Sequence, residues 1–266
     1  GCVLAGRLSE DPSVQVTLLE AGPTDTSVLI HCPAGLALLA KNGQANWALQ
    51  TTPQPGLNGR RGYQPRGKVL GGSSSVNAMI YIRGQREDYD NWAAQGNPGW
   101  SYVDVLPYFK RAEDNQRGAD DFHGTEGPLH VMDLTSPNRL GPLFVEAAQQ
   151  AGIPATDDFN SGNNEGVGYF EVNQKSGWRW NTAKAFLRPT CYGRPNFEMW
   201  TNAQVAKLVL ETTADGSRRC TGAQLWSGDE MVTVEASREV ILCAGSIGSP
   251  QILQLSGIGP AALLRE

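Results

Sequence analysis

Residues 67–79, Gly-Lys-Val-Leu-Gly-Gly-Ser-Ser-Ser-Val-Asn-Ala-Met, have the composition of a backbone that another molecule approaches closely. Their side chains add little bulk, and glycine reaches positive φ without a Cβ clash. Successive exposed N–H groups form a concavity that binds anions, so a phosphate is the first ligand to consider. A flexible Gly/Ser linker is the alternative. The flanking residues are too apolar for a linker, which favours phosphate binding: Val69, Leu70, Val76, Met79 and Ile80.

Gly1 and Glu20 fit a second nucleotide-binding pattern. In a G-x-G-x-x-G loop a pyrophosphate rests on a helix N-terminus, and an acidic residue about 20 positions later binds the ribose hydroxyls. Gly1 can be only the third glycine of such a loop, and Glu20 follows it at a suitable distance. A solvated carboxylate at a strand end is the alternative for Glu20. The Ala-Gly-Pro turn that follows it favours ribose binding.

Residues 245–259 form a third segment rich in glycine and serine, at a predicted crossing from strand to helix. Alone, it could be a tight turn that packs a helix against a sheet. Three such segments in one chain are better explained by an extended dinucleotide that touches several loops. Gly1, the helix predicted after it and the strand that ends at Glu20 together resemble the back half of a dinucleotide-binding βαβ unit.

The spacing of apolar residues predicts the elements that position these segments. A helix is predicted over residues 1–10 and a buried strand over 14–19, with Glu20 at its end. Residues 113–127 are predicted to be a solvated, acidic surface loop. Further helices are expected within residues 85–112, 136–151 and 181–187.

The last quarter of the chain changes character. Segments of alternating polarity are separated by the turn pairs Asp215-Gly216 and Gly228-Asp229, which predicts an antiparallel meander. A helix capped by Ser249, with Pro250 as its first residue, should follow. The four predicted strands cover residues 204–211, 221–226, 231–235 and 238–243.

Composition excludes several classes of protein. The 266 residues carry a net charge of −5, which argues against nucleic acid as a main partner. No apolar run approaches the roughly 18 residues of a transmembrane segment. Five scattered cysteines without a C-x-x-C pair fit reduced thiols in the cytoplasm, with peripheral membrane association left open. The three histidines have no zinc-like spacing, so no metal site is predicted.

At the level of whole motifs, the chain resembles the glucose–methanol–choline (GMC) flavoprotein oxidoreductases, particularly the bacterial choline- and alcohol-dehydrogenase-like members. Residues 67–90 and 245–259 are similar to the two signatures of that family, in the same order. Other similar blocks are Leu18-Leu19-Glu20-Ala21-Gly22, residues 91–100, 123–129 and 179–187.

The resemblance implies an α/β fold: a Rossmann-like FAD-binding domain with a small antiparallel meander, and part of a substrate-binding domain. The implied FAD-binding parts are residues 1–126, lacking a first strand, and 191–266, with residues 127–190 as the partial substrate domain. Some family members attach FAD through a histidine just before the asparagine of the Gly-Gly motif. Val76 stands there, so non-covalent FAD is expected. The implied cofactor residues are Gly1, Glu20, Val69, Gly71, Gly72, Ser73, Asn77, Ala78, Met79, Val205, Ala244 and Gly245.

The implied reaction is oxidation of a small-molecule alcohol, with a histidine as general base and hydride transfer to the flavin. The catalytic histidine and its partner would lie C-terminal to Glu266, so the chain by itself is expected to be inactive. Quinone or oxygen would reoxidise the flavin. Three alternatives stay open: a lyase of the same fold that uses FAD structurally, a non-catalytic cofactor-binding remnant, and a plain NAD-binding Rossmann domain.

Overall fold

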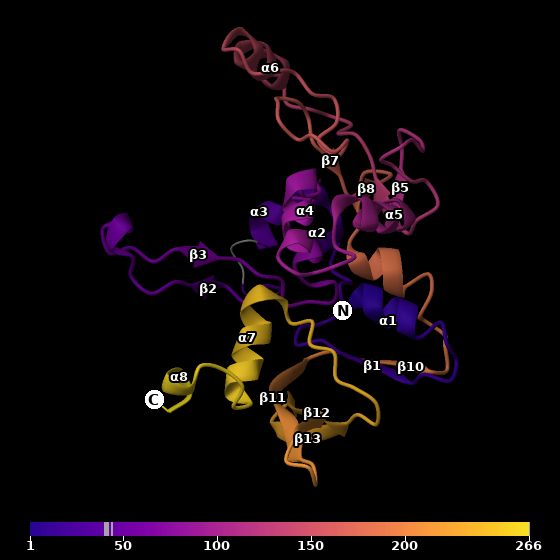
Figure 1. Ribbon diagram of the computed structural model, residues 1–266. Coiled ribbons are helices and arrows are strands. Elements are labelled where there is room, and N and C mark those ends of the chain that lie inside the picture. The colour runs from indigo at the N-terminus through magenta and orange to yellow at the C-terminus, as the bar shows by residue number, and fades with distance from the viewer. Residues whose placement is uncertain (40–42, 44, 266) are drawn as a thin grey trace. The chain divides into compact units, whose positions relative to one another are not determined.

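The computed structural model describes residues 1–39, 43 and 45–265 (Figure 1). The chain divides into two compact units. Unit 1 comprises Gly1–Thr26, Ala40–Ser73 and Leu187–Glu266, and unit 2 comprises Ser27–Leu39 and Ser74–Phe186. Helices and strands are mixed in the fold, as the α/β prediction required. Among the helices of the described residues, none has the length and apolarity needed to cross a bilayer.

Unit 1 contains a parallel strand pair from distant parts of the sequence. Helix α1 (Cys2–Leu8) leads to β1 (Val16–Leu19), which pairs with β10 (Phe197–Trp200) in the register Val16 to Phe197. The Asn196 side chain donates hydrogen bonds to three carbonyls of the α1–β1 connection, those of Ser9, Asp11 and Val14, at 2.9–3.1 Å. The predicted first helix and strand are confirmed, and Glu20 follows β1 directly.

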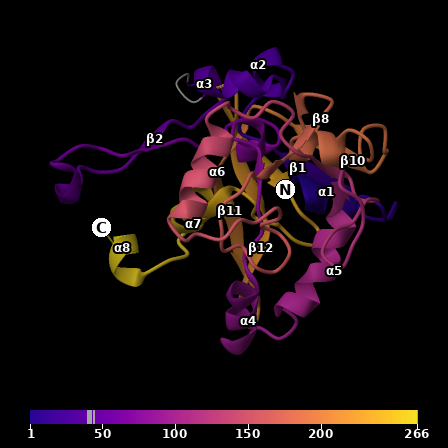
Figure 2. The same ribbon diagram turned by 90° about the horizontal axis from the view of Figure 1, so that it is seen from above.

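An antiparallel meander forms the second sheet of unit 1. Strands β11 (Ala203–Thr212), β12 (Arg218–Ser227) and β13 (Glu230–Glu235) pair in that order. Figure 2 shows β11 and β12 side by side. The predicted fourth strand at residues 238–243 is wrong, because no strand in the described part of the chain pairs with this segment. An apolar run forms a stable strand only where a neighbour accepts its backbone hydrogen bonds, and Ile241 is exposed here.

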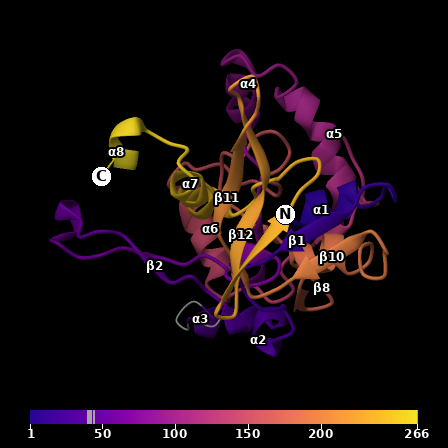
Figure 3. The ribbon, with the colours of Figure 1, turned by 90° about the horizontal axis from the view of Figure 1, so that it is seen from below.

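Helix α7 (Gly245–Leu255) begins five residues earlier than the sequence predicts and lies against β11 (Figure 3). The Ser249 cap is therefore wrong, and Pro250 lies inside the helix. Its fixed φ is helical, so the helix continues through it at the loss of one backbone hydrogen bond. The remaining elements of unit 1 are β2 (Leu49–Gln50), η2 (Pro55–Leu57), β3 (Tyr63–Gln64) and α8 (Ala261–Arg265).

Unit 2 combines short strand pairs with helices. Helices α4 (Arg86–Ala94) and α5 (Tyr102–Ala112) each begin with a capping box, formed by Gln85 with Asp88 and by Ser101 with Asp104. The other elements are α2 (Val28–His31), η1 (Pro33–Gly35), α3 (Leu36–Leu39), β4 (Ile80–Tyr81), β5 (Glu113–Asn115), β6 (Leu129–Val131), α6 (Gly141–Gln150), β7 (Glu171–Val172), β8 (Gln174–Lys175) and β9 (Trp178–Arg179). The turn η3 (Gly72–Ser75) and the π-helix η4 (Ala183–Leu187) span the unit boundaries in sequence.

The prediction of a solvated surface loop at residues 113–127 is wrong. Residues Glu113–Asn115 form β5, which pairs in parallel with β6, and the side chains of Glu113, Asn115 and His123 are buried. The polar composition of this segment reflects a buried ionic network, described below.

Candidate cofactor site

In unit 1, Glu20 lies where three segments meet. Its carbonyl accepts a hydrogen bond from the Ala203 N–H at 2.9 Å, which connects the end of β1 to the start of β11. Its carboxylate Oε1 accepts the Gly22 N–H at 2.8 Å. The Leu70 N–H donates to the Pro23 carbonyl at 2.9 Å. The structure thus brings Glu20, the predicted phosphate loop and the first residues of β11 together.

The close approach of backbone to backbone explains two of the glycines around this loop. A Cβ on Gly22 would lie 2.0 Å from the Lys68 carbonyl oxygen, and a Cβ on Gly67 would lie 2.2 Å from the Gly72 carbonyl oxygen. Gly71 and Gly72 have φ of +88° and +57°. A Cβ on Gly72 would meet no atom within 4 Å. This side of the turn is therefore bare backbone, as the sequence predicted.

The remaining predicted residues of unit 1 differ in burial and in surroundings. Val69 is fully buried, so its side chain belongs to the core and only its backbone could meet a ligand. Val205 lies in β11, next to Gln204, whose side chain accepts a hydrogen bond from the Lys68 ammonium at 3.2 Å. A Cβ on Gly1 would lie 3.7 Å from both Leu18 and Cys243. Ser73, Ala244 and Gly245 are exposed, and Gly245 has a φ of +83°.

Burial of Glu20 shapes its electrostatics. Desolvation raises the pKa of its carboxyl from 4.5 to about 7, although the Gly22 N–H and the Lys68 charge oppose the rise. A half-buried carboxylate that keeps acceptor capacity beside bare backbone suits a ligand that donates hydroxyl hydrogen bonds. Ribose binding by Glu20 remains a prediction.

The other three predicted cofactor residues belong to unit 2. Asn77 and Ala78 are exposed, whereas Met79 packs with Met132 and Val172. Met79 has a φ of +63°, and its N–H donates to the Asn77 side chain at 3.0 Å. This conformation is unusual for a residue with a large side chain. It turns the chain from the loop into β4.

Sequence reasoning missed a buried ionic network in unit 2. The Arg83 guanidinium contacts Glu113 at 2.6 Å, and the two ring nitrogens of His123 lie 3.0 Å from Glu113 and 3.1 Å from Asp158. Burial alone would lower the pKa of His123, but the hydrogen bonds and charges of Asp158 and Glu113 raise it to about 10. The imidazole is therefore a cation held between two carboxylates.

The same network contains a set of potential metal ligands. Ligand atoms of His123, Asp158 and Glu171 lie within 4.8 Å of one another. Both His123 nitrogens already face carboxylates, and Asn115 donates a hydrogen bond to Glu171 at 2.9 Å. The histidine thus supplies the positive charge that the carboxylates require. The one sequence signal was the His123-Gly124 block, whose histidine stands between acidic residues.

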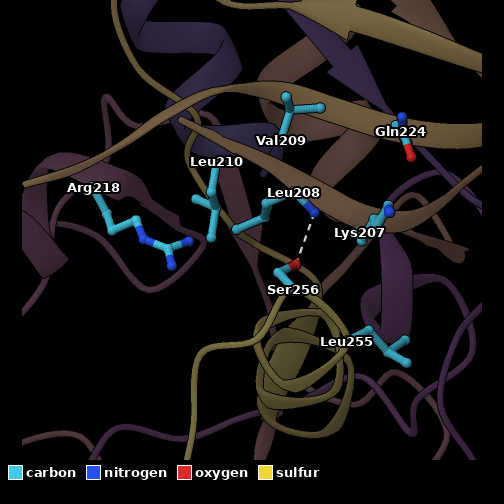
Figure 4. A pocket seen from close by; sticks show the side chains of 8 residues that line it. All are labelled: Lys207, Leu208, Val209, Leu210, Arg218, Gln224, Leu255 and Ser256. Carbon is cyan, nitrogen blue, oxygen red and sulfur yellow. Dashed lines mark hydrogen bonds between the residues drawn. The ribbon is translucent and has the colours of Figure 1, made fainter. Parts of the chain in front are cut away.

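A shallow hollow of about 320 Å³ lies elsewhere in unit 1, between β11, β12 and the end of α7 (Figure 4). The Ser256 hydroxyl accepts the Leu208 N–H there at 2.8 Å and donates to the Ile252 carbonyl. None of the predicted cofactor residues lines it. Its lining is Lys207, Leu208, Val209, Leu210, Arg218, Gln224, Leu255 and Ser256.

Comparison with known proteins decides the family. The family model described as GMC oxidoreductase matches residues 14–264. The chain belongs to the GMC oxidoreductase family. It is 47% identical, over its whole length, to an alcohol dehydrogenase (acceptor) from Pseudomonas putida, of which it covers 48%. It is 46% identical to an oxygen-dependent choline dehydrogenase from Sinorhizobium fredii, of which it covers 47%.

The fold of this GMC oxidoreductase chain also matches a solved structure. A crystallised FAD-dependent oxidoreductase from Chaetomium thermophilum is 32% identical, with a TM-score of 0.89 over all of this chain and 47% of that one. The predicted family and α/β fold class are confirmed. The GMC oxidoreductase chain spans about half the length of the curated relatives that it matches.

Proposed function

We propose that this chain is the cofactor-binding half of an FAD-dependent oxidoreductase that oxidises a small alcohol. The observation that carries the proposal is the meeting of Glu20, the bare turn at Gly71 and Gly72, and the start of β11 in one place of unit 1. The names of two relatives support the reaction class, because one is an alcohol dehydrogenase and the other a choline dehydrogenase.

The residues present fit FAD. The Glu20 carboxylate accepts the ribose hydroxyls, and the Cβ-free backbone at Gly71 and Gly72 lets the pyrophosphate approach the turn closely. Ala244 and Gly245, exposed and small, leave room beside the cofactor. When bound, FAD supplies the hydride acceptor. Val76 offers no nucleophile, so the cofactor is held non-covalently.

The proton acceptor of the reaction belongs to the part of the relatives that this chain does not match. Of the three histidines, His123 has both nitrogens between carboxylates, so it has no free lone pair to accept a proton from a substrate. We therefore expect the 266-residue chain to bind FAD but to turn over slowly or not at all, and expect activity when the other half is present. Oxygen or a quinone then reoxidises the flavin.

The test begins with the absorbance spectrum of the purified protein, which should show bound flavin. Heat denaturation should release the flavin into the supernatant, and flavin retained by the precipitate would contradict non-covalent binding. Anaerobic addition of an alcohol panel to the protein that carries both halves should bleach the flavin absorbance. Bound flavin that no alcohol bleaches would favour the lyase or the remnant over an oxidoreductase.

A rate comparison tests the division of labour between the two halves. The 266-residue chain and the longer protein are assayed with the same alcohol and acceptor. Similar rates in the two would refute the assignment of the proton acceptor to the other half. A protein without flavin absorbance, but with affinity for NAD, would refute the cofactor.

A further inference from the structure

Arg179, at the end of β9, is completely buried in unit 2 and holds the start of the loop segment that precedes β4. Its Nε donates to the Ile30 carbonyl at 2.7 Å. Its Nη1 donates to the Ser74 carbonyl at 3.1 Å and to the Asn77 side chain at 2.9 Å. One guanidinium thus contacts both ends of residues 74–77, which lie inside the predicted FAD loop.

Among the residues that the structure describes, no carboxylate balances the charge of Arg179. No salt bridge joins it to an Asp or Glu within the described residues, and its buried Nη2 has no hydrogen-bond partner among them. Desolvation lowers the pKa of Arg179 to about 10, so the group stays protonated at neutral pH. An unpaired buried charge is costly and is retained where it serves a specific interaction. A negatively charged ligand bound on the loop would offset this charge through space, without touching the buried guanidinium.

Neighbouring residues fix the same segment through neutral hydrogen bonds. The Asn181 side chain donates to the Ser75 hydroxyl at 2.8 Å, and the Thr182 N–H donates to the Ser74 hydroxyl at 3.0 Å. Asn181 also accepts the Lys184 N–H at 2.9 Å, at the start of η4. Residues 179–182 therefore form a clamp on residues 74–77. Within this clamp, Arg179 alone contributes a charge, and Asn181 contributes position without one.

We propose that Arg179 is a positioning residue for the FAD loop, and that its uncompensated charge makes the site bind reduced FAD, the more negative form, in preference to oxidised FAD. The inference rests on the proposed function and adds a source of redox tuning that the predicted cofactor residues do not include. The Arg179 guanidinium donates hydrogen bonds to Ile30, Ser74 and Asn77, and these bonds hold its charge at one place relative to the loop.

The test compares the affinity of the protein for reduced and for oxidised FAD, obtained from binding titrations and from the midpoint potential of the holoprotein. Arg179→Gln should lower the ratio of reduced-FAD affinity to oxidised-FAD affinity about tenfold, because the variant removes a unit charge from the low-dielectric interior. This tenfold change corresponds to a fall of about 30 mV in the midpoint potential of the two-electron flavin couple.

Three further variants separate charge from position. Arg179→Lys keeps the charge but loses the planar fork of donors, so FAD affinity should fall while the ratio stays within about threefold of the wild-type value. Asn181→Ala should weaken binding of both forms equally. Lys175→Gln makes the same charge change at a half-exposed side chain on β8, and should leave the ratio unchanged because water screens that charge.

Each outcome bears on the proposal. The inference would be overturned if Arg179→Gln kept the wild-type ratio of reduced-FAD to oxidised-FAD affinity. It would also be overturned if this ratio fell equally in Arg179→Gln and Arg179→Lys. If Arg179→Gln does not fold, the Arg179→Lys arm still decides, because a tenfold lower ratio with the charge kept would refute the role of charge. A wild-type protein that binds no FAD would refute the proposed function itself. Bound FAD with an unchanged ratio would refute only the inference.

Discussion

Replacing Glu20 by glutamine should stabilise the apoprotein at alkaline pH and weaken FAD binding at the same time. Burial raises the pKa of Glu20 from 4.5 to about 7. The folded state therefore holds the proton more tightly than the unfolded chain, and stability falls as pH rises from about 4.5 through about 7. At about 1.36 kcal/mol per pKa unit, full ionisation costs the folded protein about 3 kcal/mol.

Glu20→Gln removes this cost without changing the shape of the side chain. Its advantage over wild type in the free energy of unfolding should grow by about 2 kcal/mol between about pH 5.5 and about pH 8.5. The side-chain oxygen can still accept the Gly22 N–H. It loses the stronger, charge-assisted bonds that a carboxylate forms with ribose hydroxyls, so FAD affinity should fall.

Urea denaturation of the apoprotein, followed by the fluorescence of its seven tryptophans, measures this difference. Glu10→Gln is the matched control, because Glu10 is exposed and its carboxylate pairs with Arg7 just beyond the end of α1. It should change stability by less than about 0.5 kcal/mol at either pH. A Glu20→Gln advantage that does not vary with pH would refute the reasoning from desolvation.

Three other changes probe the packing and the ionic network. Protonated His123 stabilises the fold below its ordinary pKa of 6.5 and loses this effect as pH rises through about 10. Thermal midpoints should therefore fall over this pH range in wild type, and His123→Gln should flatten the profile. Glu113→Gln leaves the buried Arg83 without the carboxylate it pairs with, and His123 with Asp158 alone, so it should cost about 3–5 kcal/mol in urea unfolding. Gly22→Ala drives a Cβ into the Lys68 carbonyl and should lower the free energy of unfolding by about 2–3 kcal/mol. Gly56→Ala, whose added Cβ meets no atom within 4 Å, should leave stability nearly unchanged. Equal effects of the two substitutions would contradict the steric argument.

The sequence predicted those elements whose formation depends mainly on residues close to one another in the chain. Alternation and apolar spacing predicted α1, β1 and the first three strands of the meander, and placed Glu20 at a strand end. The bare turn at Gly71 and Gly72 also follows from composition, because positive φ without side chains is what glycine permits. These features depend on neighbours in sequence.

The errors share a different cause. Residues 238–243 are as apolar as a buried strand, but strand formation needs a partner that the sequence does not name. Glu113 and His123 look like solvated residues until Arg83 and Asp158 are placed against them. Likewise, nothing in the residues around Arg179 indicates that its charge is buried. Burial of a charge is decided by contacts between distant segments, and composition cannot report it.

The pairing of β1 with β10 joins residues about 180 positions apart, and this has a consequence for synthesis on the ribosome. Residues of unit 2 end at Phe186, before β10 is made. Since a strand cannot form its ladder before its partner has been translated, β1 must wait for the nascent chain to pass Trp200, while the segments of unit 2 are already complete. We therefore expect unit 2 to fold first, and translation pauses after residue 186 to yield a chain in which β1 is still open to proteases.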